Sequence, residues 1–226
     1  MLLWQLARSP RIGTAAVLLS GRLRTAAILI AIATAVAAAN ALRVAADVPI
    51  AAILYGDQRS PAVTMLIDLL GRERTAVVLY LVERSWDAVL VLTGVAPLFY
   101  WLLGSTAVHA AARMRARPRP YRPMLVLLGY AVPLTRIPAD LAGLALGSGS
   151  GVGPRGAELI GTLSLFLLGV ITWRGIQAHY GLARRPALRM LLLAVVLFYA
   201  VPLAVIVLAI VGLVIAAIVL GYVPEI

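Results

Sequence analysis

The chain has 226 residues, of which 62% are hydrophobic, and its mean hydropathy is +0.99. Soluble domains are about 45–50% apolar, so this composition excludes an ordinary soluble protein and predicts long segments that face lipid. The chain contains no cysteine, which excludes disulfides, thiolate metal sites and cysteine nucleophiles.

The net charge of +11 comes with 20 basic residues, all of them arginine. In a chain rich in alanine, glycine and leucine, this usage is typical of a GC-rich genome, most simply a bacterial one. A large positive charge can indicate nucleic-acid binding. Here, however, the arginines cluster at the ends of apolar runs, where such residues set membrane orientation and contact anionic lipids. We therefore expect no nucleic-acid partner.

Residues 1–24 mix apolar side chains, Trp4 among them, with arginines and form the first predicted unit. Ser9-Pro10 favours the start of a helix, because serine can cap the first turn and proline suits it. A basic amphipathic helix with a tryptophan is typical of a segment that lies on the inner leaflet. A disordered basic tail is the alternative.

Residues 25–42 form an Ala-rich apolar run between Arg24 and Arg43. About 20 helical residues cross a hydrocarbon layer of about 30 Å, so this run predicts the first span of a membrane domain over 25–222. Ala39-Asn40-Ala41 resembles a signal-peptide cleavage site, and cleavage is the alternative. The apolar run is longer than the usual signal-peptide core of about 7–15 residues, which favours a retained span.

The connection over 43–84 carries charges of both signs. Residues 61–70 and 75–82 within it are apolar but too short to span. We expect two separate interfacial helices on the outer surface.

Four more apolar runs predict four more spans, over about 88–112, 124–147, 158–180 and 190–222. The last is too long for one straight crossing, and only Pro202 could mark a turn. Proline in lipid kinks a helix more readily than it reverses the chain, so we expect one long kinked helix, with a split or re-entrant arrangement as the alternative. The predicted fold is all-α, a five-span helix bundle with an amphipathic amino-terminal helix.

The orientation follows from short basic segments, which prefer the cytoplasmic side. Two such segments are the basic loop 113–122 and the segment that follows the fourth span. Arginines in both are expected to contact anionic lipid headgroups. The residues concerned are Arg113, Arg115, Arg117, Arg119, Arg122, Arg184 and Arg185. We expect a cell-membrane protein, in a bacterium the inner membrane, with its amino terminus cytoplasmic and its carboxyl terminus outside.

Arg136 and Asp140 form the most informative polar pair, because their i, i+4 spacing puts them on one helix face. A charge near the middle of a bilayer costs at least about 2.5–3.5 kcal/mol, so it requires a partner. One interpretation is an outer-half cluster of Arg136, Asp140, Asp87 and Glu158 that lines a polar cavity or contacts a partner. The alternative is that Pro133 and Pro138 end the span early and leave an inert pair at the interface.

Signatures of catalysis are absent from the sequence. It contains no Gly-x-Ser-x-Gly elbow, no phosphate loop and no His-Glu-x-x-His motif. His109 and His179 are predicted at the inner ends of two spans, without the carboxylates that would complete a metal site. We expect no enzyme activity, no cofactor and no metal.

Small residues recur at four-residue spacing, which lets helix backbones approach closely in lipid. They are Ala27, Ala31, Ala35 and Ala39 in the first span and Ala139, Gly143 and Gly147 in the third. This spacing favours a compact bundle or self-association.

The layout resembles the Yip-one domain family of Ypt/Rab-interacting membrane proteins, in its prokaryotic branch. The resemblance covers Ser9-Pro10, the five spans, Tyr121-Arg122-Pro123 leading into Gly129, Tyr130 and Pro133, Trp173, and the turn Tyr180-Gly181-Leu182. It implies a five-helix bundle with a cytosolic amino terminus and a non-enzymatic role in membrane organisation or trafficking through protein partners. The acidic Asp-Leu-Tyr-Gly-Pro motif of eukaryotic relatives does not occur here, so the resemblance does not extend to binding of small GTPases.

Two functions remain open at this point. The first is a non-catalytic membrane protein that acts through partner contacts, with self-association or an unidentified membrane protein as partner. The alternative is a small transporter or permease subunit with a polar path around Arg136 and Asp140. A transporter predicts a polar cavity that reaches Arg136, whereas a scaffold predicts a closed bundle.

Overall fold

The computed structural model describes residues 1–48, 50–55, 61–146 and 152–221, and these ranges contain nine helices and no strand. Five helices are long and apolar enough to cross a membrane, which confirms the predicted all-α, multi-pass fold. These are α3 (Leu23–Asp47), α6 (Arg72–Met114), α7 (Arg122–Leu146), α8 (Val152–Tyr180) and α9 (Arg184–Gly221). The short helices are α1 (Leu2–Arg8), α2 (Pro10–Ser20), α4 (Ile50–Tyr55) and α5 (Pro61–Leu70).

Helix α7 is the centre of the bundle, and α1, α2, α3, α6 and α8 all contact it. Its side chains are buried on most sides, including those of Met124, Leu127 and Tyr130. A helix that is surrounded in this way has to be apolar almost all round. The few polar residues of α7 therefore have to be paired within the protein.

Pro133 and Pro138 lie inside α7 and do not end it. A proline removes one backbone donor, but in lipid a broken helix would expose many more unsatisfied groups, so the helix continues through both positions. Thr135 contributes a hydroxyl that donates to the carbonyl oxygens of Ala131 and Val132 at 3.0 and 3.1 Å. The interpretation that these prolines end the third span early is wrong.

Helix α6 differs from the prediction, because it runs without interruption through residues 75–82 and the second span. The expected separate helix at 75–82 is therefore wrong, whereas the helix at 61–70 is confirmed as α5. No helix breaker lies between the two parts of α6, and Arg84 pairs with Asp87 across one turn at 3.0 Å. The break comes earlier, at Gly71, whose φ of +80° suits glycine.

The amino-terminal segment forms two helices rather than one, since α1 ends and α2 begins around Ser9. Ser9 is the N-cap of α2 and Pro10 lies in its first turn, so the predicted helix start is confirmed. The alternative of a disordered tail is wrong, because Leu6 and Val17 are fully buried and both helices contact α7.

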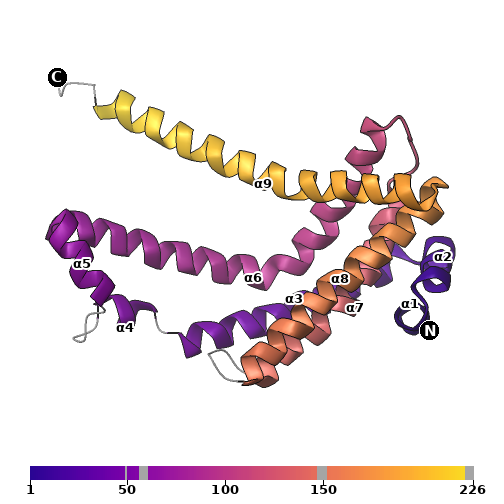
Figure 1. The fold of residues 1–226 in the computed structure, drawn as a ribbon, viewed down its shortest axis with the longest axis horizontal. Helices are drawn as coiled ribbons and strands as arrows, with labels where there is room; N and C mark the ends of the chain where they lie inside the picture. The colour runs from indigo at the N-terminus through magenta and orange to yellow at the C-terminus, as the bar shows by residue number, and fades with distance from the viewer. Residues whose placement is uncertain (49, 56–60, 147–151, 222–226) are drawn as a thin grey trace.

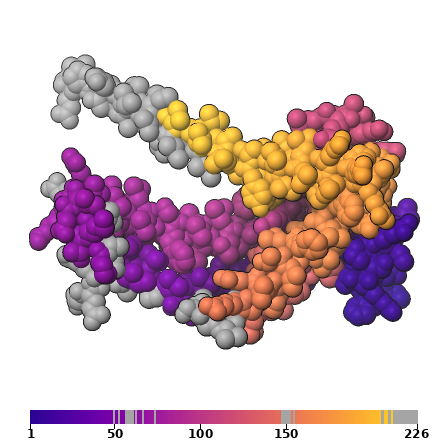
Figure 2. Space-filling model, in the orientation of Figure 1, coloured from indigo at the N-terminus to yellow at the C-terminus, as the bar shows by residue number. Residues whose placement is uncertain are grey.

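Helix α9 continues through Pro202 to Gly221, so the alternative of a split segment is wrong within the described residues. Figure 1 shows α6 and α9 changing direction partway along their lengths, and each contains one proline, Pro97 and Pro202. The first part of α6 and the last part of α9 extend away from the bundle in Figure 1, and Figure 2 shows a hollow between α6 and the coloured part of α9. Gly147 and Tyr222, the predicted ends of the third and fifth spans, lie outside the described residues, as does the carboxyl terminus.

Candidate functional site

The Arg136 and Asp140 side chains form an ion pair inside α7, with Nη2 of Arg136 3.0 Å from Oδ1 of Asp140. Only 16% and 5% of the two side chains are exposed. The helix rise places Arg136 about 21 Å from Arg122 along the axis of α7, well inside the membrane-spanning length. The prediction that these two charges pair on one helix face is therefore confirmed. The pair lies in the middle of the bundle.

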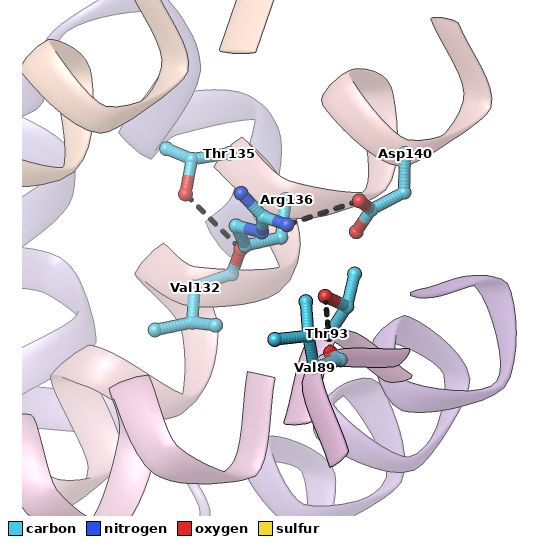
Figure 3. A network of polar contacts seen from close by, with 6 residues as sticks. All are labelled: Val89, Thr93, Val132, Thr135, Arg136 and Asp140. Atoms are coloured by element: carbon cyan, nitrogen blue, oxygen red, sulfur yellow. Dashed lines mark hydrogen bonds and ion pairs between the residues drawn. The ribbon is translucent and has the colours of Figure 1, made fainter. Parts of the chain in front are cut away.

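Neighbouring helices complete the surroundings of this pair. The Arg136 guanidinium lies over the ring of Tyr100 in α6, 5.8 Å from its centroid, which is a cation–π distance. Asn40 of α3 faces the Asp140 carboxyl group. Figure 3 shows Thr93 of α6 on the same side, its hydroxyl donating to the Val89 carbonyl at 2.8 Å. Three spanning helices therefore meet at one charged pair.

Two buried atoms of this pair, Nε of Arg136 and Oδ2 of Asp140, have no hydrogen-bond partner among the described residues. An unsatisfied buried polar atom costs about 1–3 kcal/mol. The pair therefore leaves part of its hydrogen-bonding capacity unused, and burying it does not by itself stabilise the fold.

Asp87 and Glu158 do not join Arg136 and Asp140. Asp87 pairs instead with Arg84 on the exposed side of α6, and Glu158 is exposed near the start of α8. The predicted four-residue cluster is therefore reduced to its two members in α7.

The structure adds Arg43 of α3, which sequence reasoning treated only as the boundary of the first span. Its Nη1 donates to the carbonyl oxygens of Gly143 and Leu144 near the end of α7. Nη2 lies 3.3 Å from Asp47. These carbonyls are among the last four of the helix, which lack partners within it. The i, i+4 spacing of Arg43 and Asp47, the same as that of Arg136 and Asp140, was the signal that could have identified this residue.

Gly129, Tyr130 and Pro133 are all buried in α7. A Cβ atom on Gly129 would lie 2.5 Å from the Cβ of Ala26 in α3 and 3.0 Å from Nε1 of Trp101 in α6. Trp101 in turn donates to the Leu125 carbonyl at 2.8 Å. Gly129 therefore lies where three helices approach closely, and the motif has a packing role in this structure.

Small-residue spacing predicted the packing of α7 and not that of α3. Ala139 is buried, and a Cβ on Gly143 would meet the Asn40 side chain at 2.8 Å, so this face of α7 does pack on α3. In α3 the buried positions are instead Ala26, Ile30, Ala33, Ala37 and Ala41. Ala27, Ala31, Ala35 and Ala39 are exposed in the single chain, so they do not pack within this bundle, and the alternative of self-association through them stays a prediction.

The basic residues gather at one end of the molecule. Helices α1 and α2, the α6–α7 connection and the α8–α9 turn all lie at the right of Figure 1. The exposed arginines there are Arg8, Arg11, Arg22, Arg24, Arg113, Arg115, Arg117, Arg119, Arg122, Arg184, Arg185 and Arg189. Segments 1–24, 109–123 and 174–190 contain no aspartate or glutamate. This end is a concentrated cationic surface, here called the basic face.

The two histidines lie at this same end. Nε2 of His179 is 3.0 Å from the Pro120 carbonyl oxygen, and the His109 ring meets the Tyr121 ring edge-on at 5.3 Å. Both contacts hold the α6–α7 connection against the bundle. The described residues contain no group of three or more side chains that could hold a metal ion.

Three cavities between the described helices have mostly apolar linings. One, of ≈ 900 Å³, is a groove between α6 and α9 lined by residues such as Leu98, Leu102 and Val201. A second groove lies between α3 and α6, and a smaller, partly open cavity lies between α6, α7, α8 and α9. Neither Arg136 nor Asp140 lines any of these three. These apolar cavities can bind hydrocarbon chains or the faces of other helices. The Arg136–Asp140 pair lies outside them, at the contact between α3, α6 and α7.

In comparisons with known proteins, no family model, no curated protein and no solved structure matches the chain.

Proposed function

We propose that this chain is a non-catalytic integral membrane protein that organises its membrane through protein partners within the bilayer and through anionic lipids at the basic face. The observation that carries the proposal is the closed Arg136–Asp140 pair, which joins α7 to α3 and α6 and lines none of the three cavities described above. A role in membrane organisation also agrees with the resemblance to the Yip-one domain family.

The proposed location is a cell membrane, in a bacterium the inner membrane, with the basic face and the amino terminus in the cytoplasm. The positive-inside rule supports this orientation, since the arginines of three segments share one end of the bundle. The basic face would also attract anionic headgroups, by about 1 kcal/mol for each arginine near the surface.

The proposed surface for protein partners is the groove between α6 and α9. Its lining is almost entirely apolar, and the helix parts beside it expose large side chains such as Val91, Leu203 and Leu208. In lipid, helices associate through close packing rather than through the hydrophobic effect. An open groove between two long helices offers a helix of a partner more contact than a flat surface does.

The transporter alternative requires a polar path to Arg136, and the three cavities described above have mostly apolar linings. Arg136 is occupied on one side by Asp140 and on the other by Tyr100. No observation in the described part of the chain favours this alternative over the first proposal.

Photo-crosslinking in native membranes tests the partner contact. A benzoylphenylalanine at Leu102, in the α6–α9 groove, is compared with one at Leu163, an exposed residue of α8 outside it. We expect a discrete protein adduct at Leu102 that is absent at Leu163. Lipid adducts alone at both positions would contradict the proposal.

A further inference from the structure

An open pocket of ≈ 330 Å³ lies on the basic face, between the α6–α7 connection and the start of α9. It is lined by Arg115, Arg117, Leu182, Pro186 and Met190. Ion pairs in the described part of the chain involve neither guanidinium group. The sequence contains no carboxylate between Asp87 and Asp140 or between Glu158 and Glu225. The pocket therefore presents two arginines with no acidic partner.

A second cavity lies deeper, between α6, α7, α8 and α9, with a volume of ≈ 200 Å³. Apolar side chains such as Leu168, Ala194 and Phe198 line it, together with Gly169. A Cβ on Gly169 would have no heavy atom within 4 Å, so this wall of the cavity is open. An apolar cavity of about 150 Å³ is enough to bind benzene. This one has room for a short length of hydrocarbon.

The two cavities follow one another along the same pair of helices. On α9, Pro186 and Met190 line the basic pocket and Ala194 lines the apolar cavity, and these residues are spaced by four along one helix face. On α6, Gly104 and Val108 line the apolar cavity, and Arg115 at the end of the helix lines the basic pocket. The axial distance from Pro186 to Ala194 is about 12 Å.

We propose that the basic pocket and the apolar cavity together form one binding site for an anionic phospholipid. Arg115 and Arg117 hold its phosphate by charge-assisted hydrogen bonds, and the upper part of one acyl chain lies between α6, α8 and α9. The inference rests on the proposed contact of the basic face with anionic lipid and goes further by naming one site. A free phosphate ion would use only the pocket, whereas the cavity beneath it fits a ligand with a chain.

Lipid titration of the purified full chain, followed by native mass spectrometry in mild detergent, tests the site. The probes are phosphatidylglycerol, phosphatidylcholine with the same chains, and soluble glycerol 3-phosphate. We expect one phosphatidylglycerol to bind more tightly than the others, with no displacement by glycerol 3-phosphate at equal concentration. Equal binding of glycerol 3-phosphate would show a simple anion pocket and overturn the proposal.

Two double variants test whether phosphatidylglycerol binds at the basic pocket. Arg115→Gln with Arg117→Gln is expected to weaken phosphatidylglycerol binding about tenfold or more, because hydrogen bonds to charged groups are lost. The matched control, Arg113→Gln with Arg119→Gln, removes the same charge from two exposed residues outside the pocket, in the last turn of α6 and in the α6–α7 connection. If both double variants weaken binding equally, the basic face attracts lipid diffusely and there is no single site, although the proposed lipid contact survives.

Gly169→Leu fills the apolar cavity and is expected to weaken binding by a similar factor without altering Arg115 or Arg117. Gly161→Leu is its control, since Gly161 also has open space at Cβ but does not line the cavity. Val195→Phe is a second filling variant, at another residue of the lining, should Gly169→Leu not fold. Unchanged binding in a folded filling variant would overturn the acyl-chain part of the site.

Discussion

Arg136 and Asp140 lie one helical turn apart in α7, with Nη2 and Oδ1 3.0 Å from each other inside a bundle of apolar side chains. The contact satisfies one bond of each group and leaves Nε and Oδ2 without partners among the described residues. Such a pair is costly to bury and more costly to break, because removing one partner leaves an uncompensated charge.

Breaking the pair should therefore destabilise the protein. Arg136→Leu is expected to lower the free energy of unfolding by about 3–5 kcal/mol. The measurement is denaturant or thermal unfolding in detergent. The double variant Arg136→Leu/Asp140→Leu should recover most of the loss, because no charge is then left buried. Wild-type stability in Arg136→Leu would show that the pair does not lock the bundle.

The close approach at Gly129 predicts a second effect on stability. Gly129→Ala should cost about 1–3 kcal/mol, since the new Cβ would lie 2.5 Å from that of Ala26. Gly161→Ala, where Cβ meets nothing, should instead be neutral or slightly stabilising. Ala26→Gly in the Gly129→Ala background should restore part of the loss. Equal effects at the two glycines would rule out the packing explanation.

Arg43 should stabilise the end of α7. Arg43→Leu removes the donor to the Gly143 and Leu144 carbonyls, and we expect a loss of about 1–2 kcal/mol. Arg24→Leu, at an exposed residue of the same helix, is the control and should change stability by less than about 0.5 kcal/mol. Thermal unfolding of both variants measures the difference. The cap would have no energetic role if the two variants behaved alike.

Membrane orientation can be measured directly, because the chain has no cysteine of its own. In intact cells that express the protein, an impermeant maleimide should label Glu158→Cys and not Ala116→Cys, a residue of the basic loop. Both positions are exposed. After permeabilisation both should be labelled. Labelling of Ala116→Cys in intact cells would reverse the proposed orientation.

The spanning helices could be predicted because their length and apolarity are local properties of the sequence. The helix at 61–70 and the start at Ser9-Pro10 were also local signals, and both are confirmed. The continuous α6 was not predicted, because apolar runs were judged by their composition and the charged residues 83–87 suggested a break. Charges interrupt hydrophobicity but do not by themselves interrupt a helix, and residues 83–87 contain no glycine or proline.

Tertiary contacts were harder to predict. The i, i+4 rule identified Arg136–Asp140, and the i, i+3 spacing of Arg84 and Asp87 was a local signal of the same kind that was not used. Nothing local shows that Tyr100 lies against Arg136. The packed face of α3 was missed for a similar reason: in an Ala-rich helix every face carries small residues. The position of Arg43 under the end of α7 depends on the fold as a whole.

The central claim is that the charged pair is closed to water and serves to hold helices together. Thr93→Cys, beside the pair in Figure 3, tests it most directly when the protein is reconstituted into sealed vesicles and treated with a water-soluble maleimide from both sides. Ala116→Cys, on the exposed basic loop, is the positive control. The account predicts rapid labelling of Ala116→Cys and none of Thr93→Cys. Labelling of Thr93→Cys at a comparable rate would demonstrate an aqueous path to the pair and contradict the account.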